Sequence, residues 1–214
     1  MLKLKKLFLL SLVIPIIFLS SIAYAKPFCA LRDPTVEVYE LFPLATSYKS
    51  IVHTVGKGTR SKILDILPFT IHAKEIGEHT VYAAFSDERS LGLVHVRSEL
   101  GSWGLLEIAW AIDLDGNVID FTFQRCREDG CKEIGSLNFR QQLLGMGLTD
   151  LTALMNEDGS ELLEGKLMVT PGAMELGASV IRSAMKTLVV TQMVWGDDIE
   201  VLKTYSPLTI MFNK

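Results

Sequence analysis

Four segments rich in β-branched and aromatic residues follow one another in the middle of the chain, with short turns between them. They cover residues 79–85, 91–97, 104–112 and 117–124. The last two are joined by an Asp-Leu-Asp-Gly turn at residues 113–116. Strand-forming composition and closely spaced turns together predict a consecutive antiparallel meander.

Helical patterns flank this meander. Before it, residues 34–41 predict a helix, 47–55 a strand and 60–67 a second short helix, and a proline follows each helix. Beyond Gly135 the apolar spacing is helical, and the predicted elements are helices at 139–144, 150–155 and 177–194 and a last strand at 199–204. A run of strands followed by a run of helices predicts an α+β fold, with an antiparallel sheet meander followed by packed helices.

The amino terminus has the pattern of an export signal. Lysines precede an apolar run over residues 7–22, and a small-x-small cleavage site ends at Ala25. The run is shorter than the ~20 residues that span a bilayer and contains Pro15, which argues against an uncleaved anchor. The sequence therefore predicts a signal peptide over 1–25 and a single periplasmic or secreted domain over 26–214.

Charge and histidine spacing exclude two classes of function. The chain has a formal net charge of −4, and no basic patch is interleaved with aromatic residues, so nucleic acid is not an expected partner. The four histidines are scattered, and the sequence therefore predicts no metal site. His72, His79 and His95 flank or lie in predicted strands and are interpreted as half-buried surface residues.

Three cysteines remain in the predicted mature chain. Cys126 and Cys131 bracket an Asp-Gly turn, so a local disulfide that closes this turn is the first expectation. A bridge from Cys29 to either of them is the alternative. The spacing of Cys126 and Cys131 is not that of a redox-active Cys-x-x-Cys motif, which favours a structural role over thiol chemistry. Glu128 and Asp129, between them, are interpreted as a solvated turn.

Three stretches, in this order, resemble the FMN-binding domain family, which includes flavin-carrying subunits of Rnf and sodium-translocating NADH:quinone complexes and the periplasmic part of the nitrous-oxide-reduction regulator. Residues 103–118 are similar to its Gly-rich loop, strand and Ile-Asp-x-Asp-Gly turn. Residues 139–154 are similar to its "F-x-x-Q-F-x-G-x-x-L-x-D-L" segment. Residues 177–185 resemble its Gly-Ala-Thr helix start, and Phe-Pro-Leu-Ala at 42–45 is like the end of its opening helix.

The resemblance implies a phosphate site at the start of a helix. Helix N-termini offer unpaired N–H groups and the positive end of the dipole, and small residues allow close approach of a ligand. In the family a threonine hydroxyl at this place is esterified to FMN by a flavin transferase, and Ser179 occupies that position here. The implied cofactor-binding residues are Gly177, Ala178, Ser179, Ser183, Trp103 and Gly104.

The chain also departs from the family motif. Leu176 and Ala173 replace the motif's hydroxyl residue and aspartate, and a second frame over 170–174 keeps a Gly-Ala pair but ends in Met174. Covalent FMN at Ser179, non-covalent FMN and loss of the flavin are therefore all open. The leading hypothesis is a periplasmic FMN-binding electron carrier between membrane redox proteins, without catalytic side chains. The alternative is a cofactor-free binding or accessory module on the same scaffold.

Overall fold

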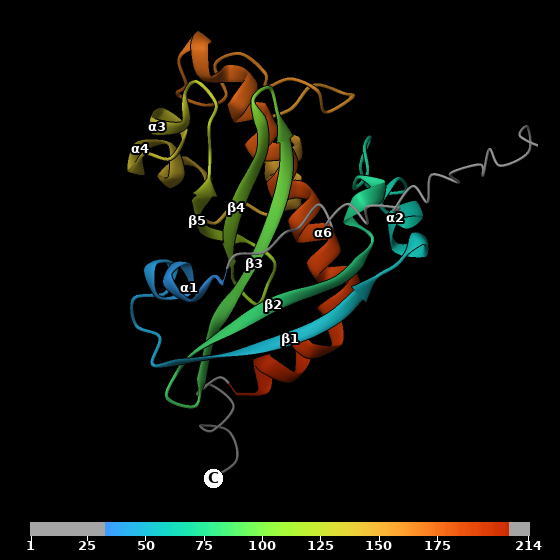
Figure 1. Ribbon diagram of the computed structural model, residues 1–214, viewed down its shortest axis with the longest axis vertical. Coiled ribbons are helices and arrows are strands. Elements are labelled where there is room, and N and C mark those ends of the chain that lie inside the picture. The colour runs from blue at the N-terminus through green and yellow to red at the C-terminus, as the bar shows by residue number, and fades with distance from the viewer. Residues whose placement is uncertain (1–32, 206–214) are drawn as a thin grey trace, which may run out of the picture.

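The computed structural model describes residues 33–205, whose centre is one five-stranded antiparallel sheet in the order β1-β2-β3-β4-β5 (Figure 1). The strands are β1 Ser47–Val55, β2 Gly77–Ser86, β3 Arg89–Gly101, β4 Gly104–Ile112 and β5 Val118–Arg125. Each strand pairs with the next along the chain. The predicted meander is therefore confirmed, and so is the α+β class.

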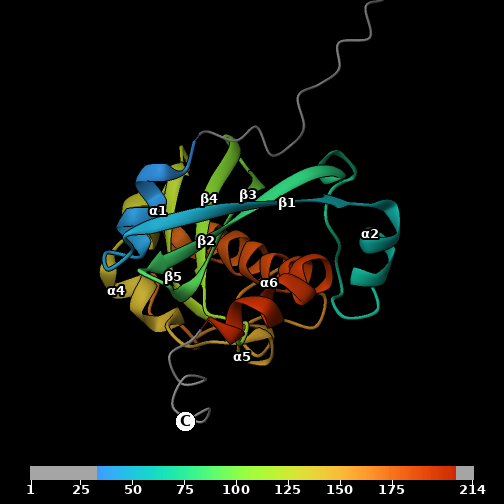
Figure 2. The same ribbon diagram turned by 90° about the horizontal axis from the view of Figure 1, so that it is seen from below.

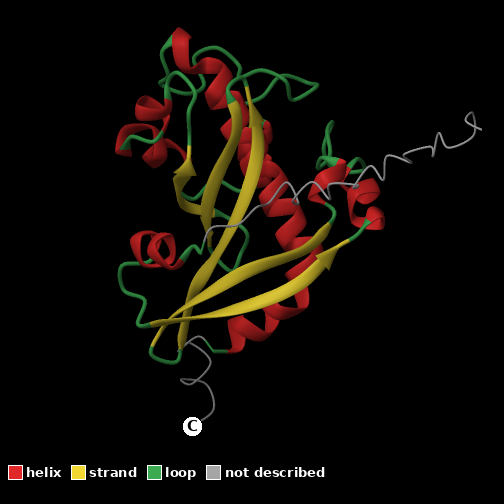
Figure 3. Cartoon of the chain, in the orientation of Figure 1, coloured by secondary structure: helices red, strands yellow, loops and turns green. Residues whose placement is uncertain are grey.

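Helix α1 precedes the sheet in the chain, α2 lies between β1 and β2, and the other α-helices follow β5. Figure 3 distinguishes these helices from the strands. The α-helices are α1 Thr35–Leu41, α2 Lys57–Ile63, α3 Cys131–Ile134, α4 Leu137–Arg140, α5 Leu148–Thr152 and α6 Met174–Thr204. The short 3-10 turns are η1 Ala73–Glu75, η2 Gln141–Leu143 and η3 Pro171–Ala173. The predicted helices near residues 34, 60, 139 and 150 all exist, with ends displaced by a few residues.

The two faces of the sheet are covered unequally. Helix α6 packs along one face and forms the larger core with the side chains of Leu93, Ile108 and Trp110 (Figure 2). Helix α1 covers part of the other face, where Val94 and Ala109 belong to a smaller core cluster. Alternate residues along β3 and β4 thus enter different cores, as the pleat of a strand requires.

The predicted last strand at 199–204 is wrong, because these residues continue α6. Trp195, Ile199 and Leu202 are buried at helical spacing, so the apolar face of α6 runs on past the expected end near residue 194. The short window 199–204 gave no means of telling a strand from the end of a long helix. The helix also begins at Met174 instead of Gly177, after the 3-10 turn η3.

Two expectations concern residues outside the described range of 33–205. The signal peptide predicted over residues 1–25 lies there, and so does Cys29. Among the helices of the described part, none is long and apolar enough to cross a membrane.

Candidate functional site

A pocket of about 390 Å³ lies where the tip of the β3–β4 hairpin meets the start of α6. Both segments lie at the same end of the molecule (Figure 1). Three walls enclose the pocket: residues 100–103 of the hairpin, Glu128 and Asp129 of the loop after β5, and the region from Gly172 to Arg182 at the start of α6. Volumes of this size are typical of small-molecule sites.

Two carboxylates hold the hairpin tip in place. The backbone N–H of Trp103 donates a hydrogen bond to Glu128 Oε1 at 2.7 Å, and the hydroxyl of Ser102 donates to Glu175 Oε1 of α6 at 3.0 Å. A Cβ atom at Gly101 would overlap the Glu128 carboxyl group, so only glycine allows this close approach. The tip is thereby fixed from two sides, while the indole of Trp103 stays 70% exposed.

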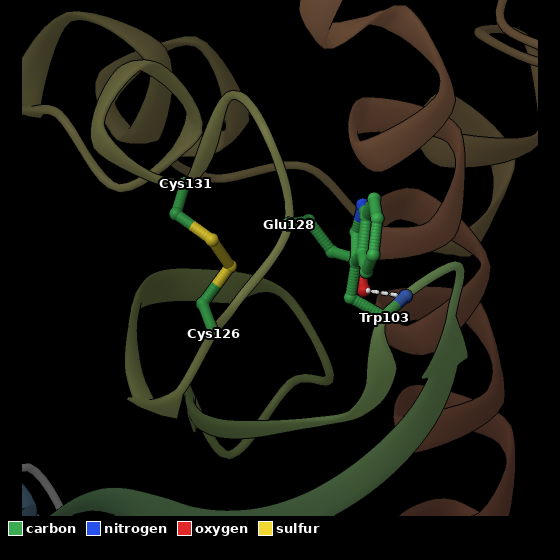
Figure 4. Close-up of a disulfide and its surroundings, with 4 residues drawn as sticks. All are labelled: Trp103, Cys126, Glu128 and Cys131. Carbon is green, nitrogen blue, oxygen red and sulfur yellow. Dashed lines mark hydrogen bonds between the residues drawn. A yellow bond between two sulfur atoms is a disulfide. The ribbon is translucent and has the colours of Figure 1, made fainter.

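The loop that carries Glu128 is closed by a disulfide. Cys126 at the end of β5 and Cys131 at the start of α3 are bridged, which is the first expected pairing (Figure 4). The Glu128 side chain extends from this loop toward Trp103 (Figure 4). Gly130 has a left-handed φ of +88°, and a side chain there would meet Ala173 at 2.8 Å. The loop therefore lies between the hairpin tip and η3.

Helix α6 supplies the third wall and the one cation among the pocket-lining residues. Ser179 Oγ donates to the Glu175 carbonyl at 3.1 Å and accepts from Arg182 Nη2 at 2.9 Å. Arg182 Nη1 also donates to the carbonyl of Ser160. At the start of α6, the backbone N–H of Met174 donates to the carbonyl of Pro171 in the preceding turn η3. The predicted Ser179 thus lies at the pocket, next to a guanidinium group.

The other predicted cofactor residues lie in different places. Gly177 and Ala178 are buried, and a Cβ at Gly177 would meet Leu162 at 2.8 Å, so this pair packs against the interior. Ser183 is buried under the sheet, where its hydroxyl accepts a hydrogen bond from the indole of Trp110 at 3.1 Å. Gly104, with a φ of +125°, forms the turn beside Trp103. Of the six predicted residues, Trp103 and Ser179 line the pocket.

The sequence interpretation missed most of the polar lining. Glu128 and Asp129 were interpreted as a solvated turn, yet both line the pocket. Their position between two cysteines was the available signal, because a bridge there fixes the loop in one conformation. Arg182 had no such signal, since a basic residue on a helix usually faces solvent.

A second polar group is buried deeper between β3 and α6. We call Glu75, Arg97, Glu99 and Lys186 the buried ion cluster. Arg97 pairs with Glu75, and Lys186 Nζ lies 2.5 Å from Glu99 Oε2 and 3.9 Å from Glu75 Oε1. All four residues are buried, with Arg97 only 1% exposed. The cluster adjoins the pocket, because Glu99 precedes Leu100 and Lys186 lies one turn after Arg182.

Two histidines extend this polar region, and both are more buried than expected. His79 and His95 are buried, which corrects their interpretation as half-buried surface residues. His79 Nε2 bonds the carbonyl of Glu75 at 2.6 Å, and His95 Nδ1 bonds the hydroxyl of Thr191 at 2.8 Å. Burial, followed by the charge of Arg97, lowers the pKa of His79 to about 4 and holds the pKa of His95 well below its usual value. Both rings are therefore neutral at pH 7.

Within residues 33–205, no three His, Cys, Asp or Glu side chains gather closely enough to hold a metal ion. Comparison of the chain with family models, with curated proteins and with solved structures gave no match.

Proposed function

We propose that the protein is a periplasmic FMN-binding electron carrier that exchanges electrons with membrane redox proteins. One observation carries this proposal: Trp103 and Ser179, taken from two separate motifs of the resemblance, line the same pocket. The disulfide and the predicted signal peptide support a location outside the cytoplasm.

FMN has an aromatic ring system and a phosphate group, and the lining residues offer a contact for each. The exposed indole of Trp103 is a flat face on which an aromatic ring stacks. Arg182 is the cationic donor that suits a phosphate. The flavin would supply the redox chemistry, while the side chains bind and orient it.

The geometry of Ser179 makes covalent attachment conditional. Its hydroxyl is engaged with Glu175 and Arg182, and the residue is only 5% exposed. An ester to FMN at this oxygen requires both hydrogen bonds to be released and a flavin transferase to reach the site. Non-covalent FMN requires neither, so it is the form that the pocket favours.

The absorption spectrum and intact mass of protein secreted by a host with a flavin transferase test these forms. A flavin spectrum with added FMN mass, lost in Ser179→Ala and kept in Thr170→Val, means attachment at Ser179. Thr170 is the matched control because it lies at the second motif frame and bonds Glu133 away from α6. A flavin spectrum at unchanged mass means non-covalent binding. A colourless protein that also fails to bind added FMN contradicts the proposal.

The charge of the pocket favours a second candidate, the cofactor-free binding module. Glu128, Asp129 and Glu175 line the pocket together with one basic residue, Arg182. Three carboxylates repel a phosphate and favour a neutral or cationic ligand. Comparing FMN with riboflavin, which lacks the phosphate, separates the candidates. Tighter binding of FMN, weakened in Arg182→Gln, supports the flavin carrier. Binding of neither compound leaves the accessory module.

A further inference from the structure

The loop between Cys126 and Cys131 connects the pocket to a bond that thiols can break. It places Glu128 against the hairpin tip and packs Gly130 against Ala173 at the start of α6. The disulfide closes this loop at its base (Figure 4). Both cysteines are partly exposed. Each cysteine also packs against the larger core.

Closure of the loop limits where Glu128 can lie. The bridge spans five positions in sequence and fixes the Cα atoms of the two cysteines 6.0 Å apart. Cys131 also begins the four-residue helix α3, whose Ile134 is buried in the larger core. Without the bridge, residues 127–130 gain conformational freedom, and each hydrogen bond from this loop must then overcome the entropy of ordering it.

We propose that the Cys126–Cys131 disulfide is a redox-controlled latch on the pocket, acting through Glu128. In the oxidised protein Glu128 holds the backbone of Trp103, so the hairpin wall is closed against the loop. In the reduced protein Glu128 leaves Trp103, and the Ser102–Glu175 bond remains as the tie on the α6 side. Glu128 is thus a positioning residue for Trp103, and the disulfide controls it.

The chemistry is thiol–disulfide exchange with a dithiol reductant. A thiolate of the reductant attacks one sulfur of the bridge, and the other cysteine leaves as a thiolate. The second thiol of the reductant then attacks the mixed disulfide. The protein gains two electrons and two protons as two thiols, and the reductant becomes a disulfide. An oxidised dithiol closes the latch again by the reverse steps.

Hydrogen exchange at tryptophan N–H groups offers a direct test, because the chain has three tryptophans and each reports on a different region. The Trp103 backbone N–H reports on the latch. The indole N–H of Trp110 donates to the buried Ser183, and that of Trp195 donates to the carbonyl of Ile51 on β1. In ¹⁵N-tryptophan-labelled protein, reduction with dithiothreitol should raise hydrogen exchange at the Trp103 amide on the order of tenfold. The two core indoles should be unchanged.

Variants distinguish a latch that acts through Glu128 from a disulfide that only stabilises the fold as a whole. Oxidised Glu128→Ala should show the fast Trp103 exchange of the reduced protein, and reduction should then add nothing at Trp103. Cys126→Ser with Cys131→Ser should exchange rapidly with or without reductant. Unchanged Trp103 exchange on reduction overturns the proposal, and so does an equal rise at all three tryptophans, which means general loosening. Because no ligand is added, the result is independent of whether the pocket takes a flavin.

Discussion

The interface between β3 and α6 has polar groups at two places that are built in opposite ways. In its middle, the buried ion cluster places charges of both signs out of water and next to one another. At its end, the pocket has carboxylates that reach water and hold backbone and hydroxyl groups of the hairpin tip. The two places are adjacent on both elements.

The difference shows which polar groups fix the fold and which shape the site. Burying an ion pair costs desolvation energy that its attraction only partly offsets, so each partner depends on the other. Arg97 is an extreme case, because its Nε and Nη1 atoms have no hydrogen-bond partner within residues 33–205. The carboxylates of the pocket make single, partly solvated hydrogen bonds, so the loss of one should change local geometry more than global stability.

Removing one partner of the buried ion cluster should have the largest effect. Arg97→Met leaves Glu75 with Lys186 at 3.9 Å as its remaining cation, so we expect a loss of roughly 3–5 kcal/mol in unfolding free energy. Urea denaturation followed by tryptophan fluorescence measures it. The matched change at the pocket, Glu175→Ala, should cost about 1 kcal/mol or less.

The double variant Arg97→Met with Glu75→Gln is the control for this prediction. It removes both charges of the pair, so it should recover a large part of the loss caused by Arg97→Met alone. Equal losses from Glu175→Ala and Arg97→Met would mean that the middle and the end of the interface do not differ.

Acid should lower the stability of the protein through the buried histidines beside the middle of the interface. The folded protein protonates His79 only near pH 4, whereas an unfolded chain does so near 6.5. Between these values the unfolded state binds more protons, so stability is full above pH 6.5 and falls as pH is lowered toward 4. The loss from His79 is on the order of 3 kcal/mol, and His95 acts in the same direction.

Unfolding free energies at pH 7, 6, 5 and 4 measure this slope. His79→Gln should flatten it, because a neutral amide takes up no proton in this range. An unchanged slope in this variant would contradict the assignment of the slope to His79.

The sequence predicts the strands of this protein better than its site, for physical reasons. Strand alternation and turn residues are local signals, so the order of strands could be derived. The end of α6 could not, because a window of six residues around Ile199 does not distinguish a strand from the last turns of a helix. The start of α6 was displaced by one turn, since Gly-Ala pairs occur at both 172–173 and 177–178.

The site depended on contacts between distant segments. Trp103 and Ser179 each stand in a recognisable motif, and both line the pocket. Arg97 pairs with Glu75, and Lys186 pairs with Glu99. Each pair joins residues from separate elements, so no local sequence pattern predicts it. The same holds for the burial of His95, which depends on the position of α6.

Two glycines near the pocket should differ in a way that tests how tightly its end is packed. Gly130→Ala forces a left-handed φ on alanine and brings its Cβ to 2.8 Å from Ala173, so we expect a loss of roughly 1–2 kcal/mol. Gly172→Ala meets no atom within 4 Å and should be almost neutral. Equal urea midpoints for the two variants would show that the disulfide loop shifts enough to accommodate a side chain at Gly130.

The smallest effect on stability should come from Trp103→Ala. The indole is 70% exposed, so its removal takes little apolar surface from the core, and we expect a change within about 0.5 kcal/mol. The backbone N–H that Glu128 holds is still present in alanine, so the hairpin tip keeps its position. Flavin binding, by contrast, should weaken about tenfold if the ring stacks on this indole. Isothermal titration with FMN measures binding, and urea denaturation measures stability. If the variant loses stability but binds FMN as tightly as the parent protein, Trp103 contributes to the folded core and does not stack on the flavin. That result would contradict the proposed role of Trp103 in flavin binding.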